Sequence, residues 1–86
     1  MKQPPIEELL EKLSAVLEGR LTREEVSDWA FAYVCSDRIE VRDFLAWDLL
    51  AVMTAMDMPD FDKPQYLYSE EDLRAWLREY MEKSGF

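Results

Sequence analysis

Carboxylates are the side chains with which this chain could do chemistry, and six of them lie between residues 57 and 72. The whole chain has 19 acidic and 10 basic residues, no histidine and one cysteine. The stretch 57–72 contains one lysine, so it carries minus five of a net charge of minus nine. Phe61, Tyr66 and Tyr68 interleave with these acids, and aromatic anchors among charges are typical of protein interfaces. The alternative is that Phe61, Leu67 and one tyrosine close the end of the core while the acids are only solvated.

A calcium site can be tested against this stretch. Asp60, Asp62 and Glu71 occupy positions one, three and twelve of a twelve-residue loop, which is the spacing of calcium ligands. Pro64 and Gln65 stand where that loop needs an oxygen ligand and a glycine. We therefore predict no calcium site. With no histidine and one cysteine, the chain also lacks the usual ligands of zinc.

Catalytic motifs are also missing from the chain. Without histidine there is no Ser-His or Cys-His pair, and two glycines cannot build a phosphate-binding loop. Cys35 ends an apolar helical stripe and is expected to be a small core residue. Asp48 lies in an apolar helix, where it needs a partner or an edge position. A salt bridge to an arginine is expected rather than a catalytic role. We predict no enzyme and no cofactor.

The apolar residues recur at steps of three and four, which predicts an all-α protein. The length allows one domain, residues 1–86, with one small core. We expect a compact four-helix bundle-like domain. Its helices are predicted at residues 5–18, 23–35, 41–56 and 70–83.

Capping residues mark the ends of these helices. Thr22 and Ser69 each begin a capping box, and Gly85 is suited to stop the last helix. The third helix is apolar around most of its circumference, so it is expected to be central and to contact the other three. The sequence does not decide whether Trp47 and Trp76 belong to the core or to an interface.

The charge balance points away from anionic partners. A net charge of minus nine repels nucleic acid and anionic membranes, and the basic residues are scattered from Lys2 to Lys83. We therefore expect no nucleic acid and no membrane as partners, and a basic protein instead. No uninterrupted apolar stretch follows Met1, and a single cysteine suits a reducing compartment, so a cytoplasmic location is expected.

Two runs, residues 21–30 (LTREEVSDWA) and 66–77 (YLYSEEDLRAWL), resemble small acidic bacterial proteins. Some of these resemble the immunity proteins of contact-dependent and polymorphic toxin systems. The resemblance implies tight binding to a toxin domain.

The charge and the resemblance together favour an immunity-type inhibitor that neutralises a basic toxin or nuclease by direct binding. The alternative is a non-catalytic regulatory or scaffolding protein that self-associates as a homodimer or docks a partner through Trp47, Leu50 and Met58. The residues predicted to contact the partner all belong to the acidic stretch. They are Asp57, Asp60, Asp62, Tyr66, Tyr68, Glu70 and Glu71.

Overall fold

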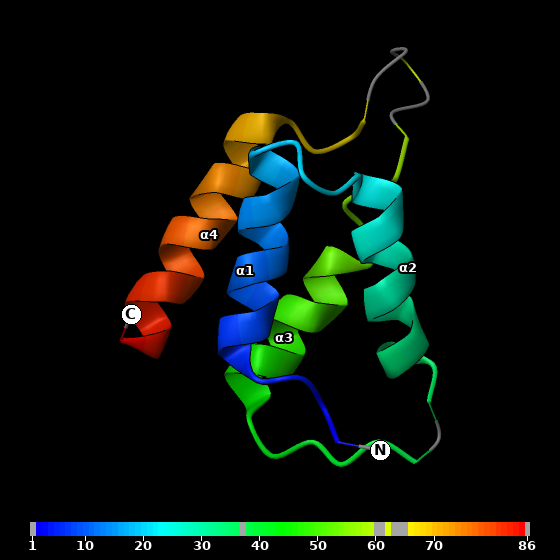
Figure 1. Ribbon diagram of the computed structural model, residues 1–86, viewed down its shortest axis with the longest axis vertical. Coiled ribbons are helices and arrows are strands. Elements are labelled where there is room, and N and C mark those ends of the chain that lie inside the picture. The colour runs from blue at the N-terminus through cyan, green and yellow to red at the C-terminus, as the bar shows by residue number, and fades with distance from the viewer. Residues whose placement is uncertain (1, 37, 60–61, 63–65, 86) are drawn as a thin grey trace.

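The structure, a computed structural model, describes residues 2–36, 38–59, 62 and 66–85. Within these ranges it contains four α-helices (Figure 1). They are α1 (Ile6–Leu17), α2 (Arg23–Val34), α3 (Phe44–Met53) and α4 (Glu70–Ser84). The all-α, four-helix prediction is confirmed, and the predicted bounds of α1, α2 and α4 are correct to within one residue.

Helix α3 is shorter than the predicted range of 41–56 because a cap and a series of tight turns limit it. Asp43 is extended and is the N-cap, and its carboxylate accepts hydrogen bonds from the backbone N–H groups of Leu45 and Ala46. After Met53, the backbone N–H groups of residues 54–56 bond three residues back instead of four. The apolar pattern continues through this turn, so the pattern alone overestimates the helix.

The predicted caps of α2 and α4 are present. The Thr22 side chain accepts a hydrogen bond from the backbone N–H of Glu25, while the Glu25 carboxylate accepts from the Thr22 hydroxyl instead of the backbone. Ser69 and Asp72 form a complete capping box at the start of α4. Gly85 ends α4 with φ of 84°, a left-handed conformation that glycine adopts without steric cost.

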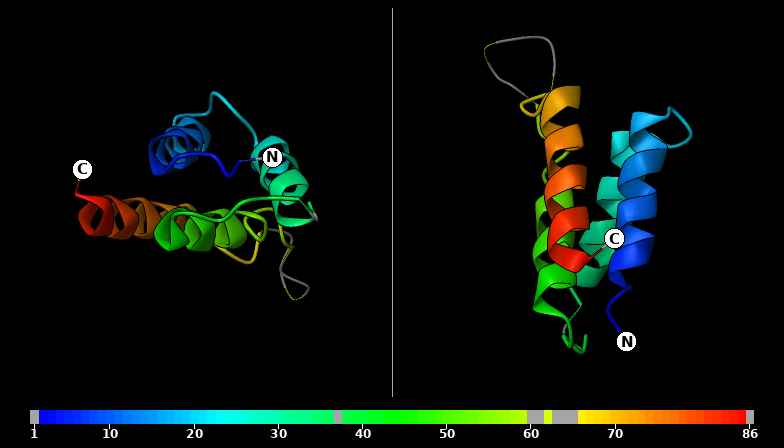
Figure 2. Two further views of the ribbon diagram at one scale, coloured as in Figure 1. Left: turned by 90° about the horizontal axis from the view of Figure 1, so that it is seen from below. Right: turned by 90° about the vertical axis from the view of Figure 1, so that its left-hand side faces the viewer.

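The helices form two layers, with α1 and α2 in one and α3 and α4 in the other (Figure 2). Helix α3 contacts α1, α2 and α4, as predicted for a central helix, and α1 also contacts the other three. The core between the layers is aliphatic and sulfur-rich. Its largest fully buried side chains are Leu9, Leu13, Val26, Leu49, Leu50, Met53, Met56 and Leu73.

The three side chains predicted to form an apolar docking surface on the third helix differ in burial and position. Leu50 is completely buried, and Trp47 is half-buried against the core. Met58 is 45% exposed and lies beyond the end of α3. Trp76 is also half-buried against the core. Trp47, Leu50 and Met58 therefore do not form one exposed surface.

The N-terminal segment is attached to the connection between α2 and α3. Lys2 and Glu40 form an isolated parallel bridge. The Gln3 side-chain oxygen accepts hydrogen bonds from the backbone N–H groups of Arg42 and Asp43, at 2.6 and 3.1 Å. The Gln3 amide nitrogen donates to the carbonyl of Asp43 at 2.9 Å. One glutamine thus fixes two segments about 40 residues apart in sequence.

Candidate functional site

Arg23, on the first turn of α2, binds both ends of the acidic connection. Its Nη1 donates to the carbonyl oxygen of Met56 at 3.0 Å and to that of Tyr68 at 2.6 Å. Its guanidinium carbon lies 4.4 Å from the centroid of the Tyr66 ring, a cation–π contact. One side chain of α2 therefore contacts three residues at the two ends of the α3–α4 connection.

Tyr66 makes a second contact with α2. Its hydroxyl donates a short hydrogen bond to Oε1 of Glu24. This bond lowers the pKa of the Glu24 carboxyl and raises the pKa of the Tyr66 phenol. The ring and the hydroxyl of Tyr66 therefore both contact side chains of α2, although Tyr66 is 37% exposed.

Asp57 and Tyr68 also have partners within the fold. The buried Ser27 hydroxyl lies 2.9 Å from Oδ1 of Asp57 and 2.9 Å from the carbonyl oxygen of Thr54. The Tyr68 ring meets Trp76 edge to face, with centroids 4.9 Å apart. The contact of Tyr68 fits the alternative that one tyrosine closes the end of the core, whereas Leu67, 46% exposed, does not take part. Phe61 lies outside the described residues.

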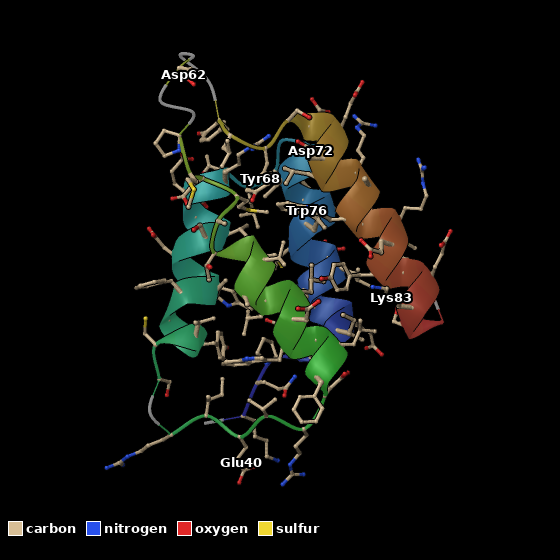
Figure 3. All side chains as sticks on the ribbon, turned by 180° about the vertical axis from the view of Figure 1, so that it is seen from behind. Glu40, Asp62, Tyr68, Asp72, Trp76 and Lys83 are labelled. Atoms are coloured by element: carbon tan, nitrogen blue, oxygen red, sulfur yellow. The ribbon has the colours of Figure 1, made fainter. Side chains whose placement is uncertain are left out.

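The remaining predicted contact residues are more exposed. Glu70 pairs with Arg74 one turn along α4, at 2.5 Å. Glu71 and Asp62 are exposed, and Asp62 lies at one extremity of the molecule (Figure 3). Asp60 lies outside the described residues. The assignment of these seven residues as partner contacts stays a prediction.

Asp48 has the partner and the edge position that the sequence requires, but Cys35 does not lie as predicted. Asp48 is exposed, and its Oδ2 accepts a hydrogen bond at 2.6 Å from the Tyr80 hydroxyl instead of pairing with an arginine. Cys35 is exposed at the C-cap of α2 instead of buried, because the core-facing stripe of α2 ends before it. In the described ranges no three Asp, Glu or Cys side chains converge as metal ligands, and no helix there is long and apolar enough to span a membrane.

A group of cations lies at the end of the molecule opposite Asp62. Lys2, Arg38 and Arg42 belong to the N-terminal segment and the α2–α3 connection, where Glu40 also lies (Figure 3). Arg42 pairs with Glu40 at 3.2 Å, and both side chains are largely exposed. Phe44, which follows on the first turn of α3, is 79% exposed. We call Lys2, Arg38, Arg42 and Phe44 the basic end.

A shallow hollow of about 290 Å³ lies between the two segments at the basic end. Pro4, Pro5 and Ile6 supply apolar surface. Two cations, Lys2 and Arg42, and two acids, Glu40 and Asp43, also line it. The sequence prediction missed this group because it treated the basic residues as scattered. The one local signal was Arg38 and Arg42, four residues apart in a connection, whereas the approach of Lys2 depends on the tertiary contact made by Gln3.

Comparison with known proteins decides the family. The sequence model of the family described as YxzC DNA-binding protein matches residues 5–80. The chain belongs to this YxzC family. A relative in Bacillus subtilis (strain 168), "Uncharacterized protein YxzC", is 44% identical over 75 residues. The match covers 87% of this chain and 61% of the relative, so the chain spans about three fifths of that protein's length. No solved structure matches.

The YxzC family match corrects several predictions. The suggested kinship with immunity proteins is wrong, and with it the function as a toxin inhibitor and the basic toxin partner. The expectation that nucleic acid is not a partner is contradicted by the description of the family. The sequence prediction had treated the basic residues as scattered. In the fold, the N-terminal segment and the α2–α3 connection, which contain Lys2, Arg38 and Arg42, lie side by side at the end of the molecule opposite Asp62 (Figure 3).

Proposed function

We propose that this chain is a non-enzymatic regulatory protein that acts on DNA, and that the basic end makes the contact. Membership of a family described as DNA-binding supports the nucleic-acid partner. The absence of histidine and of any phosphate-loop motif from the sequence supports a role without catalysis. This corresponds to the regulatory alternative drawn from the sequence, with DNA in place of a protein partner. Such a protein works in the cytoplasm, where bacterial DNA lies.

The observation that carries the proposal is that Lys2 and Arg42 meet at one hollow, beside Glu40 and Asp43, at the end of the molecule opposite Asp62. The longest dimension is 37 Å, and the basic end and Asp62 lie at its two extremes. The Debye length is about 10 Å at 0.1 M ionic strength, so a phosphate near Arg42 is screened from the acids of the far end. Contact through the basic end keeps those acids away from the DNA.

The groups at the basic end suit contact with a nucleic-acid backbone. Lys2 and Arg42 are exposed, and the Gln3 hydrogen bonds hold their two segments side by side. Arginine binds phosphate oxygens with a rigid fork of donors, while lysine acts as a compact point charge. The exposed Phe44 ring supplies an apolar surface next to these cations.

Fluorescence anisotropy with a labelled DNA duplex tests the proposal. Binding by Lys2 and Arg42 should weaken with salt, with a log–log slope of about −0.9 per phosphate contacted and thus about −1.8 for two contacts. Arg42→Glu should remove most of the binding. Arg20→Glu is the matched control, because it makes the same charge change at an exposed site that pairs with Glu11 and Glu18 and lies outside the basic end. Equal loss in both variants, or no binding by the wild type at low salt, would contradict the proposal.

A further inference from the structure

The face shared by α1 and α4 has an apolar ridge with a hollow on each side. Leu77 and Met81 of α4 form the ridge, and Met81 is 37% exposed. One hollow, of about 220 Å³, lies between the ridge and α1. The other, of about 450 Å³, lies on the far side of the ridge along α4. A ridge between two hollows can interlock with a second ridge of the same shape.

The two edges of this face have opposite charge. Glu7 and Glu11 of α1 border the smaller hollow. Arg74 and Arg78 of α4 border the larger one, with Glu82 at its C-terminal end. Arg74 pairs with Glu70 and Glu11 pairs with Arg20. Glu7 and Arg78 are exposed and form none of the ion pairs among the described residues, so both remain available for a charge on a second molecule.

We propose that this face binds a second copy of the chain, forming a two-fold symmetric homodimer. A self-complementary face is what a two-fold interface requires, because the same patch serves both copies. An axis parallel to the helices lays the acidic edge of each copy against the basic edge of the other. An axis perpendicular to the helices would lay acids against acids. The charge pattern therefore selects the parallel axis, in which Arg78 of each copy faces the acidic edge of α1.

The dimer is expected to be weak and to depend on concentration. Only Leu77 and Met81 supply an apolar ridge, which places the interface at the small end of specific interfaces. A two-fold axis parallel to the helices places the basic ends of both copies at the same end of the dimer. The consequence of this arrangement for DNA rests on the proposed function. Two sets of cations could then contact one DNA molecule.

Sedimentation of the purified chain without DNA tests the dimer directly. The wild type should pass from 10.2 kDa to twice that mass as concentration rises. Met81→Asp should abolish the change. Met58→Asp is the matched control, since it places the same carboxylate on another exposed methionine outside this face. Met81 is partly exposed, so the variant should fold, and its helical circular dichroism checks this.

A charge exchange tests the orientation of the two copies. Arg78→Glu should weaken the dimer, and adding Glu7→Arg should restore it, because both contacts across the two-fold axis are then reversed. A wild type that stays monomeric at all concentrations, equal effects of Met58→Asp and Met81→Asp, or no restoration by the second change would each overturn the proposal. Because no DNA is present, these outcomes are independent of the DNA-binding measurement.

Discussion

At the scale of the residue, Arg23 joins segments that no local pattern connects. Its guanidinium reaches carbonyl oxygens 33 and 45 residues further along the chain. Hydrogen bonds from a charged donor contribute about 1.5–3 kcal/mol each, and a buried carbonyl left without a donor is costly. We therefore expect Arg23→Met to lower the free energy of unfolding by about 3 kcal/mol. Urea denaturation followed by circular dichroism measures this.

Arg42→Met is the control for the Arg23 substitution. Arg42 has an exposed side chain paired with the exposed Glu40, and surface ion pairs contribute little. Its loss should change the free energy of unfolding by less than about 0.5 kcal/mol. If the two variants were equally stable, Arg23 would not be the fastening between α2 and the acidic connection.

Tyr80 gives a prediction for alkaline pH. Burial and the hydrogen bond to Asp48 raise the pKa of the Tyr80 phenol above its ordinary value. A raised pKa in the folded state means that the folded protein holds this proton more tightly than the unfolded chain does. The contribution of this proton to the free energy of unfolding is therefore complete below about pH 10, which is the pKa of the phenol in the unfolded chain. This contribution is lost as the pH rises further.

Tyr80→Phe should therefore lower the free energy of unfolding by about 1 kcal/mol at neutral pH. Above about pH 10, the free energy of unfolding should fall less in this variant than in the wild type. Tyr66 also has a raised pKa, so the fall should shrink without disappearing. Urea denaturation at neutral and alkaline pH provides the comparison. An identical alkaline loss in both proteins would show that the Tyr80 proton is not the one involved.

At the scale of the element, the local rules predicted most of the fold. Caps such as Thr22 and Ser69 and the stop at Gly85 act within one turn of the chain, so they could be recognised from sequence. The end of α3 could not be recognised from the sequence. After Met53 the backbone hydrogen bonds change from four-residue to three-residue spacing, but the apolar pattern continues unchanged. The placement of the acidic connection depended on the distant Arg23, which no periodicity shows.

The cap of α4 is the element whose contribution can be isolated most cleanly. Ser69 accepts from the backbone N–H of Asp72 at 3.2 Å, and the Asp72 carboxylate accepts from the backbone N–H of Ser69 at 2.8 Å. Ser69→Ala should lower the free energy of unfolding by about 1 kcal/mol, because an N–H at the helix end loses its acceptor. Ser69→Asp keeps an acceptor and should retain most of the stability. Chemical denaturation of the three proteins decides this, and equal loss in both variants would mean that the hydroxyl acts in another way.

At the scale of the whole molecule, the net charge of minus nine is a poor guide to what each surface attracts. The amino-acid composition does not say where residues lie in the fold. It therefore could not show that Lys2 approaches the α2–α3 connection or that Asp62 lies at the opposite end of the molecule. The candidate site therefore depended on tertiary contacts, chiefly those of Gln3, and was missed. Local charge within a Debye length, not the total, decides which partner a surface can accept.

This distinction can be measured with two substitutions that remove the same charge. Glu40→Gln, at the basic end, releases Arg42 from its ion pair, whereas Glu71→Gln removes an acid at the start of α4 near the far end. At about 0.15 M salt the Debye length is about 8 Å, so only Glu40→Gln should strengthen DNA binding. At about 0.01 M the Debye length grows to about 30 Å, close to the 37 Å length of the molecule, and Glu71→Gln should then strengthen it as well. Anisotropy titrations at both salt concentrations give the comparison, and equal effects of the two variants at the higher salt would mean that total charge governs binding.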